Sequence, residues 1–394
     1  MKKSVLILLL WLGGLSATAQ PAAHYAAWAD TLTRMTGFAP TGGNGVTYTS
    51  DGEVFLAEML EDIRGAKESV FLEFYWFDSD KVGRQVREAL IEKAREGVRV
   101  CVTLDNLVTP FAPERFYEKI RRAGGEVRYA RDFRKMSLGR SVGSVFSQRD
   151  HRKILVVDHC IAWTGGMNIC NPAIYEWNDL EMRLTGPVAA AMGTLFARRW
   201  AQLGGEALSV PESGGEGPVV MQVIPGDADD TIADIYTQAV RQARKYIYIQ
   251  TPYFVPPPSL TEAMGEAARR GVDVRMMLEK SDHGFMDELA KDYYAPLLAD
   301  GVRVSVRQGL FDHSKTFVAD DALVGCGTQN LDNRSFFINL ENNVFLYDEA
   351  LAREMAGRFL EIESSARIMK ASDVAAKGLR RLYRRFLRSF SPLL

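Results

Sequence analysis

The sequence predicts an α/β protein of two pseudo-symmetric lobes, each a mixed β-sheet flanked by helices, with a functional site between the lobes. β-branched, apolar runs alternate with single amphipathic helices, which is the pattern of a helix-covered parallel or mixed sheet. These segments recur in the same order in two halves of the chain, together with the same polar residues. The 394 residues are 47% hydrophobic, which is enough for a large core.

The chain begins with a segment typical of protein export. Lys2 and Lys3 precede an apolar run over residues 5–15, and the small residues Ala-Thr-Ala follow at 17–19. The run is well short of the roughly 20 residues that span a bilayer. We therefore expect a signal peptide over residues 1–19 and an exported protein, periplasmic or peripherally membrane-associated. An uncleaved N-terminal membrane anchor is the alternative.

An internal duplication defines the domain organisation. Three segments of the first half correspond to three of the second: SVFLEFYWFDSD from Ser69 to YIYIQTPYFVPP from Tyr246, GVRVCVTLDN from Gly97 to GVDVRMMLEK from Gly271, and GGEVRYA from Gly124 to DGVRVSV from Asp300. We expect a first lobe over residues 20–205, a Gly/Pro/Ser-rich linker over 206–218, a second lobe over 219–370 and a C-terminal helix over 371–394.

Composition narrows the function classes. Lys and Arg number 48 against 50 Asp and Glu, so the net charge is -2, which disfavours a nucleic-acid binder held by global positive charge. A charged fraction of 25% with 10% aromatic residues excludes a largely disordered chain. The 4 cysteines have no C-x-x-C spacing, which argues against a structural zinc site or a redox motif.

The duplicated polar residues lie in two matching phrases, DHRKILVVDHCIAWTGGMN and DHSKTFVADDALVGCGTQN. The first phrase contains His151, Lys153, Asp158, Gly165, Gly166 and Asn168, and the second contains His313, Lys315, Asp320, Gly327, Thr328 and Asn330. A carboxylate follows each asparagine at the same interval of eleven residues, Asp179 after Asn168 and Glu341 after Asn330.

The spacing of these residues suits a phosphate group. On a strand, residues two apart project to the same face, so the histidine and lysine of each phrase point together. A lysine ammonium has no lone pair and repels cations, so these pairs do not suit a metal. Lysines, asparagines and the Gly165–Gly166 turn can instead surround phosphoryl oxygens. Two histidines brought together provide a nucleophile on one side of phosphorus and an acid on the other.

The pattern HxKx4Dx6GGxN, present twice with Gly-Thr for Gly-Gly in the second copy, resembles the signature of the phospholipase D superfamily. Within it the chain is most similar to bacterial cardiolipin synthases, through HRKILVVDHCIAWTGGMNI, YEWNDLEMRLTGP, IYIQTPYFVPPPSLTEAM, GVDVRMMLEKSDH and GTQNLDNRSFFINLEN. The resemblance extends from about Tyr48 to Leu394. It implies two phospholipase D-type lobes and a phosphatidyl transfer between two phosphatidylglycerol molecules that releases glycerol. If water replaces the lipid alcohol, the product is phosphatidic acid.

The resemblance also assigns roles, residue by residue. His151 attacks phosphorus to form a phosphohistidine, and His313 protonates the leaving alcohol and then deprotonates the incoming one; the near-symmetry leaves the reverse assignment open. The phosphoryl oxygens are held by Lys153, Lys315, Asn168 and Asn330. The two imidazoles are oriented by Asp179 and Glu341. Asp158 and Asp320 complete the catalytic set of the motif, although we expect them to be structural partners near strand ends. The chemistry requires no cofactor or metal ion.

Two other function classes remain open. The first is a secreted hydrolase of the same superfamily, either a phospholipase D-type phosphodiesterase or, less favoured by the neutral charge and export signal, a nuclease. Transferase and hydrolase differ in whether a lipid alcohol or water reaches the phosphohistidine, which the candidate residues do not decide. The second is a non-catalytic lipid-binding scaffold, against which the intact double set of His, Lys and Asn argues.

Two basic segments are candidates for contact with anionic lipid. The stretch before the first histidine is fourteen residues longer than its counterpart (26 against 12), and it contains Arg131, Arg134, Lys135, Arg140 and Arg149 with interspersed Phe133, Met136 and Phe146. Near the C-terminus, Leu379, Leu382, Tyr383, Phe386, Leu387 and Phe390 fall on one helical face and Arg380, Arg381, Arg384, Arg385 and Arg388 on the other. Many cardiolipin synthases carry two N-terminal membrane helices, so we expect the loop 131–149 and the helix to attach this chain to the membrane surface instead. A solvated loop and a helix packed on the protein's own core are the alternatives.

Overall fold

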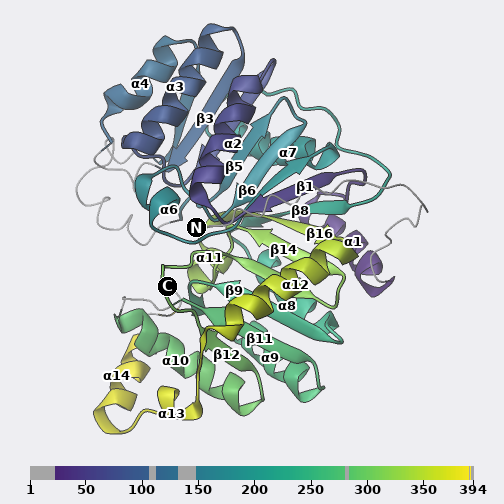
Figure 1. Cartoon of the computed structure of the whole chain (residues 1–394), viewed down its shortest axis with the longest axis vertical. Helices are drawn as coiled ribbons and strands as arrows, with labels where there is room; N and C mark the ends of the chain where they lie inside the picture. Colours follow the sequence, from purple (N-terminus) through teal and green to yellow (C-terminus); the bar gives the residue numbers. More distant parts are fainter. Residues whose placement is uncertain (1–22, 106–111, 132–147, 280–283, 390, 392–394) are drawn as a thin grey trace.

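The computed structural model describes residues 23–105, 112–131, 148–279, 284–389 and 391, and it forms two stacked lobes with one mixed β-sheet in each (Figure 1). The predicted export signal and most of the predicted basic loop lie outside these residues. Among the helices that are described, none has the length and apolarity needed to cross a bilayer.

The first lobe contains a sheet of seven strands. In spatial order they are β1 (Gly45–Thr49), β7 (Glu181–Thr185), β6 (Ile161–Gly165), β5 (Lys153–Val157), β2 (Ser69–Phe74), β3 (Arg99–Asp105) and β4 (Glu126–Arg131). The pairs β2–β3 and β3–β4 are parallel, and the other pairs are antiparallel. The two parallel pairs are connected by helices, as the alternation of strands and helices in the sequence predicts.

The second lobe repeats this order and adds one edge strand. Its eight strands are β8 (Val220–Asp227), β16 (Leu340–Tyr347), β14 (Leu323–Gly327), β13 (Thr316–Ala319), β9 (Tyr246–Thr251), β11 (Asp273–Leu278), β12 (Arg303–Val306) and β17 (Arg367–Ile368). β10 (Phe254–Val255) and β15 (Leu331–Asp332) form a small parallel pair. The predicted α/β class with two pseudo-symmetric mixed sheets is thus confirmed.

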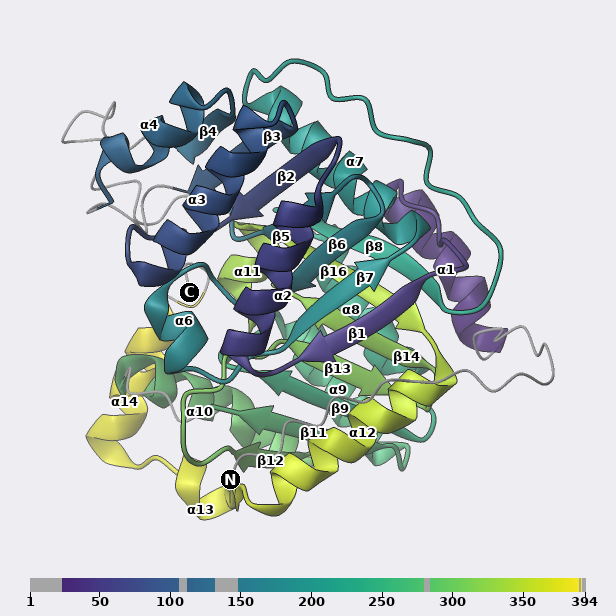
Figure 2. The same cartoon turned by 45° about the horizontal axis from the view of Figure 1, so that its top comes forward.

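Helices cover both sheets. The first lobe contains α2 (Gly52–Gly65), α3 (Lys81–Arg95), α4 (Glu114–Arg122), α6 (Asn171–Tyr175) and α7 (Pro187–Gln202). The second contains α8 (Thr231–Gln242), α9 (Pro258–Arg269), α10 (Gly284–Ala299), α11 (Asn333–Phe337), α12 (Glu349–Ser364), α13 (Ala371–Val374) and α14 (Gly378–Arg388). In Figure 2, α2 and α3 lie in front of the first sheet and α7 lies behind it.

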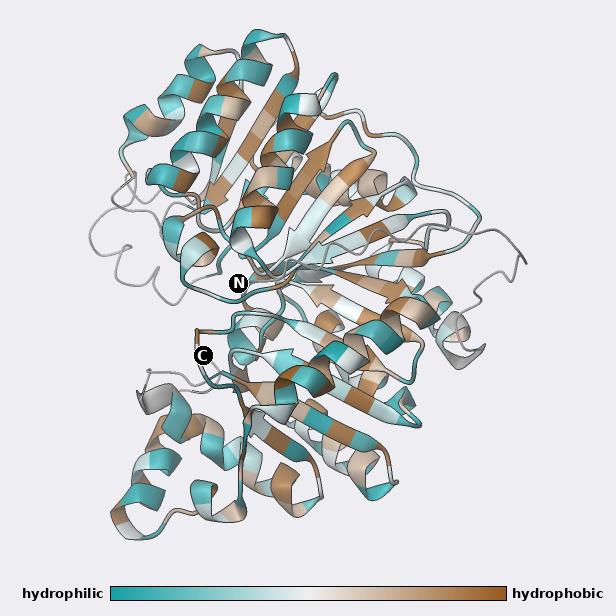
Figure 3. Cartoon of the chain, viewed as in Figure 1, coloured by the Kyte–Doolittle hydropathy of each residue, from teal (hydrophilic) through white to brown (hydrophobic). Residues whose placement is uncertain are grey.

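A shared apolar core joins the lobes. One cluster packs β2, β3 and β5 under α2 and α3, and a second packs the corresponding strands of the other lobe under α8, α9 and α10. A third combines side chains of both sheets with α7 and α12. Its aromatic stacks are symmetric: Phe71 on Phe196 in one lobe and Tyr248 on Phe359 in the other, each with centroids 5.0 Å apart. Apolar residues accordingly concentrate in the strands and polar residues on the outer helices (Figure 3).

Helix α1 (Ala23–Thr36) corrects one predicted boundary. The sequence predicts a first lobe over residues 20–205, but α1 packs on the second lobe. The Trp28 indole lies 5.7 Å from the Phe345 ring, and its Nε1–H donates to Gln238 at 3.1 Å. The duplication did not reveal this, because α1 precedes the first repeated segment.

Candidate active site

Two short backbone bridges between the lobes build the site. Asp150 pairs with Leu340, and Asn178 pairs with Asp312, both in parallel orientation. The His151 N–H donates to the Leu340 carbonyl at 2.9 Å, and the next N–H after Asp312 donates to the Asn178 carbonyl at 2.7 Å. Each bridge therefore joins the residue before a histidine of one lobe to the residue before a carboxylate of the other.

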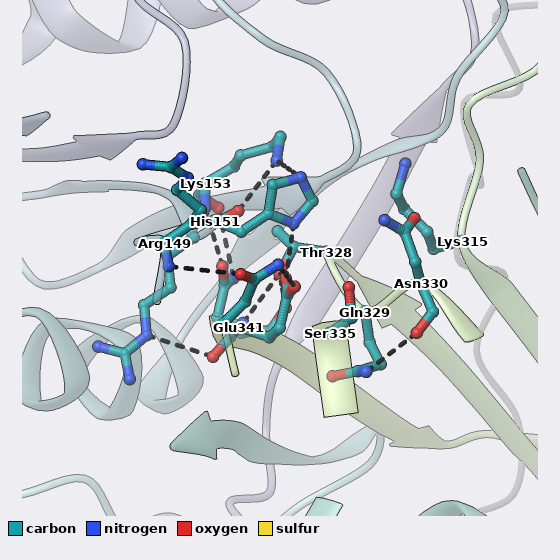
Figure 4. Close-up of polar contacts among 12 residues, drawn as sticks. Arg149, His151, Lys153, Lys315, Thr328, Gln329, Asn330, Ser335 and Glu341 are labelled. Carbon is teal, nitrogen blue, oxygen red and sulfur yellow. Dashed lines mark hydrogen bonds and ion pairs between the residues drawn. The ribbon is translucent and has the colours of Figure 1, made fainter. Parts of the chain in front are cut away.

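As a result, each histidine contacts the carboxylate of the opposite lobe. His151 Nδ1 lies 2.8 Å from Glu341 Oε2, and His313 Nδ1 lies 2.8 Å from Asp179 Oδ2. Figure 4 shows His151 between Glu341 and Lys153. Because a carboxylate oxygen accepts at Nδ1, each neutral ring carries its proton there and has its lone pair on Nε2.

Burial and nearby cations keep both imidazoles neutral. Burial lowers the pKa of His151 well below its usual range, and the Lys153 and Lys315 charges lower it further. Burial and Lys315 lower the pKa of His313 to about 4, although Asp179 opposes the shift. A neutral imidazole with an unprotonated Nε2 is the form that attacks an electrophile.

The two carboxylates differ. Burial raises the pKa of Asp179, but the stronger combined effect of Lys315 and the His313 hydrogen bond leaves that pKa below its usual range. Burial raises the pKa of Glu341 to about 7, against the opposing effect of Lys153. The Thr328 hydroxyl also donates to Glu341 Oε2 at 2.5 Å. Thr328 replaces a glycine of the first copy, so this hydrogen bond exists on one side only.

The two lysines reach the same region as the histidines. Lys153 Nζ lies 3.2 Å from His151 Nε2 and donates to the His151 carbonyl at 2.9 Å. Lys315 Nζ makes the equivalent contact with the His313 carbonyl. Burial lowers the pKa of Lys153 to about 8 and that of Lys315 to about 7.

The asparagines and glycines complete the site. Asn168 and Asn330 are buried, and the side-chain oxygen of each has no hydrogen-bond partner. A Cβ at Gly166 would collide with the Asp179 carboxylate, and one at Gly165 with the Leu180 carbonyl. These glycines therefore permit the close approach of strands β6 and β7 that brings Asp179 to His313.

Asp158 and Asp320 lie away from this cluster, which corrects their place in the catalytic set. Asp158 directly follows β5 and Asp320 directly follows β13. Each aspartate is five positions after the lysine of its motif, and a strand rises ~3.3 Å per residue, so it lies at the end of the strand away from the site. The Asp158 carboxylate accepts three backbone N–H groups, from residues 67–69, at 2.8 Å each. Asp320 accepts the N–H groups of residues 244–246. Asp158 thus ties the end of β5 to the segment that leads into β2, and Asp320 ties the end of β13 to the segment that leads into β9.

Aromatic rings flank the histidines, and sequence analysis did not single them out. The Tyr75 ring meets His151 edge-on at 4.7 Å, and the Trp177 ring lies 5.3 Å from His313. The Phe311 ring is 5.8 Å from His313. Phe311 lies two residues before His313, and Trp177 lies two residues before Asp179. Because alternate residues of an extended segment share a face, this spacing is the sequence signal that could have identified them.

In the described part of the chain, no three His, Cys, Asp or Glu side chains gather as metal ligands. The geometry instead presents two lone pairs, two ammonium groups and amide groups to one space between the lobes. Such a set stabilises an anion of tetrahedral or trigonal-bipyramidal phosphorus, and it supplies a base on each side.

Comparisons with known proteins agree on one family. The family model described as cardiolipin synthase, PLD-like domain, matches residues 59–200 and 236–362. The major cardiolipin synthase ClsA of Bacillus subtilis (strain 168) is 34% identical over 339 residues, which are 82% of this chain and 69% of that protein. A cardiolipin synthase of Clostridium perfringens (strain SM101 / Type A) is 30% identical over 374 residues, covering 89% and 77% of the two chains.

Solved structures share the fold at low identity. The phosphatidylserine synthase of Haemophilus influenzae Rd KW20 superimposes with a TM-score of 0.67 at 14% identity, covering 89% of this chain and 95% of that one. The polyphosphate kinase of Porphyromonas gingivalis gives a TM-score of 0.59 at 12% identity, covering 89% and 53%. These structures therefore share the overall fold of this chain.

Proposed function

Because the chain belongs to the cardiolipin synthase family of phospholipase D-like proteins, we propose that it is a phosphatidyltransferase that makes cardiolipin from two phosphatidylglycerol molecules. The observation that carries the proposal is the pair of buried histidines, each held at Nδ1 by a carboxylate of the other lobe. That arrangement provides a nucleophile and an acid on opposite sides of one phosphodiester.

In the first step, His151 Nε2 attacks phosphorus, the bond from phosphorus to the glycerol oxygen breaks, and His313 Nε2–H protonates that oxygen. His313 is the better acid because Asp179, whose pKa is low, is ionised and stabilises an imidazolium. The bound phosphodiester is negative, so it offsets the lysine charges and raises the pKa of His313 toward the value an acid needs.

In the second step, His313 takes the proton of the second phosphatidylglycerol hydroxyl, whose oxygen attacks the phosphohistidine and releases His151. The ammonium groups of Lys153 and Lys315 and the amide groups of Asn168 and Asn330 would hold the non-bridging oxygens through both steps. The site residues are unchanged at the end of the cycle, and no cofactor enters this scheme.

The decisive experiment incubates the purified chain with phosphatidylglycerol vesicles and resolves the products by mass, beside His151→Ala and His313→Ala. We expect cardiolipin and free glycerol, both lost in the two variants. Phosphatidic acid as the sole lipid product would establish the hydrolase, and no turnover of phospholipid would contradict the proposal. A rapid denaturing quench at alkaline pH, where the P–N bond of a phosphohistidine survives, should place the phosphoryl group on His151, and a phosphoryl group on His313 would reverse the two roles.

We further propose that α14 attaches the protein to an anionic membrane surface. Its exposed side chains include Leu379, Leu382, Tyr383 and Phe386, which are 85%, 65%, 45% and 60% exposed. Arg381, Arg385 and Arg388 are exposed beside them. An apolar stripe flanked by arginines is the pattern of a helix that lies in the interface of an anionic bilayer.

The docking of α14 explains why this stripe faces outward. Arg384 is 1% exposed, and its Nε lies 3.0 Å from Glu288 Oε2 of α10; Arg380 Nε lies 2.9 Å from the same oxygen. Leu387 joins the core of the second lobe. Among the described residues of the predicted apolar face, Leu387 fits the alternative that the helix packs on the protein's own core. Two arginines that were predicted to face lipid, Arg380 and Arg384, hold the helix in place instead.

Within the described residues, the basic loop offers less surface for contact with lipid than predicted. Arg149 is 5% exposed, and its backbone N–H donates to Asn339 Oδ1 of the second lobe at 3.3 Å. It therefore belongs to the contact between the lobes rather than to a lipid surface. Residues 132–147 lie outside the described part of the chain, so their contact with lipid stays a prediction, as do the export signal and the absence of a nucleic-acid partner.

A further inference from the structure

The residue before each histidine lies in a matching hydrogen-bond network. The Asp150 N–H donates to Asp105 Oδ2 at 3.1 Å, and the Asp312 N–H donates to Glu279 Oε2 at 2.6 Å. Asp105 and Glu279 occupy equivalent positions at the ends of the repeats GVRVCVTLD and GVDVRMMLE. Both networks thus hold a segment that bridges to the other lobe.

An arginine neutralises each of these aspartates. Arg199 Nε of α7 donates to Asp150 Oδ2 at 2.6 Å, and Arg307, which follows β12, contacts Asp312 Oδ2. Asp150 is 4% exposed and Asp312 is also 4% exposed. Both aspartates are therefore buried carboxylates with one cationic partner.

The networks differ at one position. In the second lobe, Gln250 of β9 donates its amide N–H to Asp312 Oδ2 at 2.5 Å. The equivalent residue of β2 in the first lobe is Glu73, which is 1% exposed and lies against Asp150. Both oxygens of Glu73 and the Oδ1 oxygen of Asp150 are buried with no donor. Two ionised carboxylates in this position would repel each other, and Arg199 is already paired with Asp150, whereas one shared proton satisfies the contact.

We propose that Glu73 is a protonated carboxylic acid that donates a hydrogen bond to Asp150 and thereby positions the segment that carries His151. Its proton replaces the amide N–H that Gln250 supplies in the second lobe. Glu73 is a positioning residue, because it acts on His151 through Asp150 and the bridge to Leu340. Its effect on turnover rests on the proposed function, but its protonation does not.

The surroundings of Glu73 favour the neutral form. Burial raises the pKa of Glu73 well above its usual range, and the Asp150 charge raises it further, whereas Arg152 and Arg199 oppose the shift. Neither arginine is free to neutralise Glu73, because Arg199 is paired with Asp150 and Arg152 Nη2 lies 2.7 Å from Asp227 Oδ1. The neighbouring residue on β3 is Thr103, which is uncharged.

The proposal predicts a pH dependence with a defined sign. Between the ordinary glutamate pKa and the raised pKa of Glu73, the folded protein binds one proton more than the unfolded chain. The stability contributed by this proton is therefore lost as pH rises through that window. Above the folded-state pKa, Glu73 and Asp150 are both negative and the segment before His151 loses its hydrogen bond.

The test compares Glu73→Gln, Glu73→Ala and Gln250→Glu with the parent chain by urea unfolding from pH 5 to pH 9. Glu206→Gln is the control, because the Glu206 side chain is 87% exposed. We expect the decline of stability with pH to be shallower in Glu73→Gln than in the parent, because one of the buried acids with a raised pKa is removed while Glu341 remains, and to be steeper in Gln250→Glu. A pH profile of Glu73→Gln parallel to that of the parent would overturn the shared proton. This readout needs no turnover, so it stands apart from the test of the proposed function.

Turnover tests the positioning role. Glu73→Gln should retain kcat within about twofold, whereas Glu73→Ala should lose about 10- to 100-fold in kcat with little change in KM, because His151 is displaced by a fraction of an ångström. If Glu73→Ala fails to fold, Glu73→Met, which has a similar volume and no donor, replaces it. If the folded variant without a donor, Glu73→Ala or Glu73→Met, has the same kcat as Glu73→Gln, then Glu73 does not position His151.

Discussion

Each histidine of the site receives its orientation from a residue more than a hundred positions away in the sequence. His151 contacts Glu341, and His313 contacts Asp179, so neither lobe contains a complete histidine–carboxylate pair. An aspartate beside Nδ1 holds the tautomer in which Nε2 is the reactive atom, and it stabilises the imidazolium that forms when that atom takes a proton. The consequences can be measured one residue at a time.

Asp179→Asn should lower kcat by about 10²–10⁴-fold, because the neutral amide neither stabilises the His313 imidazolium nor excludes the wrong tautomer. Glycerol release from phosphatidylglycerol vesicles measures the effect. Glu212→Gln in the exposed linker is a matched control, and both variants should unfold cooperatively. A decrease of less than about threefold would exclude the proposed role of Asp179.

The site lysines predict the alkaline limb of the pH profile. Because the pKa of Lys315 lies at about 7 and that of Lys153 at about 8, kcat/KM should fall as pH rises from 7 to 8 and the ammonium groups lose their charge. A bound phosphodiester raises both pKa values, so the limb of kcat should lie at higher pH than that of kcat/KM. Rates measured at constant ionic strength and vesicle composition check this; coincident limbs would contradict it.

At the scale of elements, α14 shows how ion pairs decide which face of a helix remains exposed. An amphipathic pattern usually places the apolar face inward. Here Arg384 and Arg380 bind Glu288, whose pKa they lower, and the stripe of Leu379 and Leu382 faces outward. Hydropathy alone left both orientations of the helix open, because the acidic partner lies on α10, 92 residues before Arg380 and 96 before Arg384.

Leu379→Asp combined with Leu382→Asp should weaken binding to phosphatidylglycerol vesicles by at least about tenfold, since two apolar side chains no longer enter the interface and two negative charges approach an anionic surface. Co-sedimentation with phosphatidylglycerol and with phosphatidylcholine vesicles measures the change. Leu360→Asp on α12 is the matched control, because Leu360 is 38% exposed at another surface. Equal binding of the double variant and the control would contradict attachment through α14.

At the scale of the whole molecule, the duplication allowed much of the architecture to be predicted. Repeated strand and helix segments indicated two similar sheets, and their strand orders match. The repetition also identified the candidate residues of the site, because chance does not reproduce His151, Lys153 and Asn168 at the same spacing. It did not show which carboxylate contacts which histidine, or that α1 packs on the second lobe. Those facts depend on how the two lobes pack, and no local pattern encodes that packing.

The same packing predicts that the linker is dispensable once the chain has folded. Residues 205–217 contain no helix or strand, and Glu212 is exposed. The contact between lobes is held instead by the shared apolar core, by the bridges at Asp150 and Asn178, and by β-bridge pairing between Thr41 and Met221. Burial of a continuous apolar surface stabilises such a contact without a covalent connection.

A protease site inserted between Glu212 and Ser213 should therefore be cleaved without separating the lobes. We expect the cleaved protein to elute from gel filtration at the position of the uncleaved chain and to retain most of its turnover, because both histidine–carboxylate pairs need both lobes. Denaturing electrophoresis confirms the cut, and the uncleaved insertion variant is the control. Separation of the fragments with loss of turnover would mean that the linker, rather than the interface, holds the two halves of the site together.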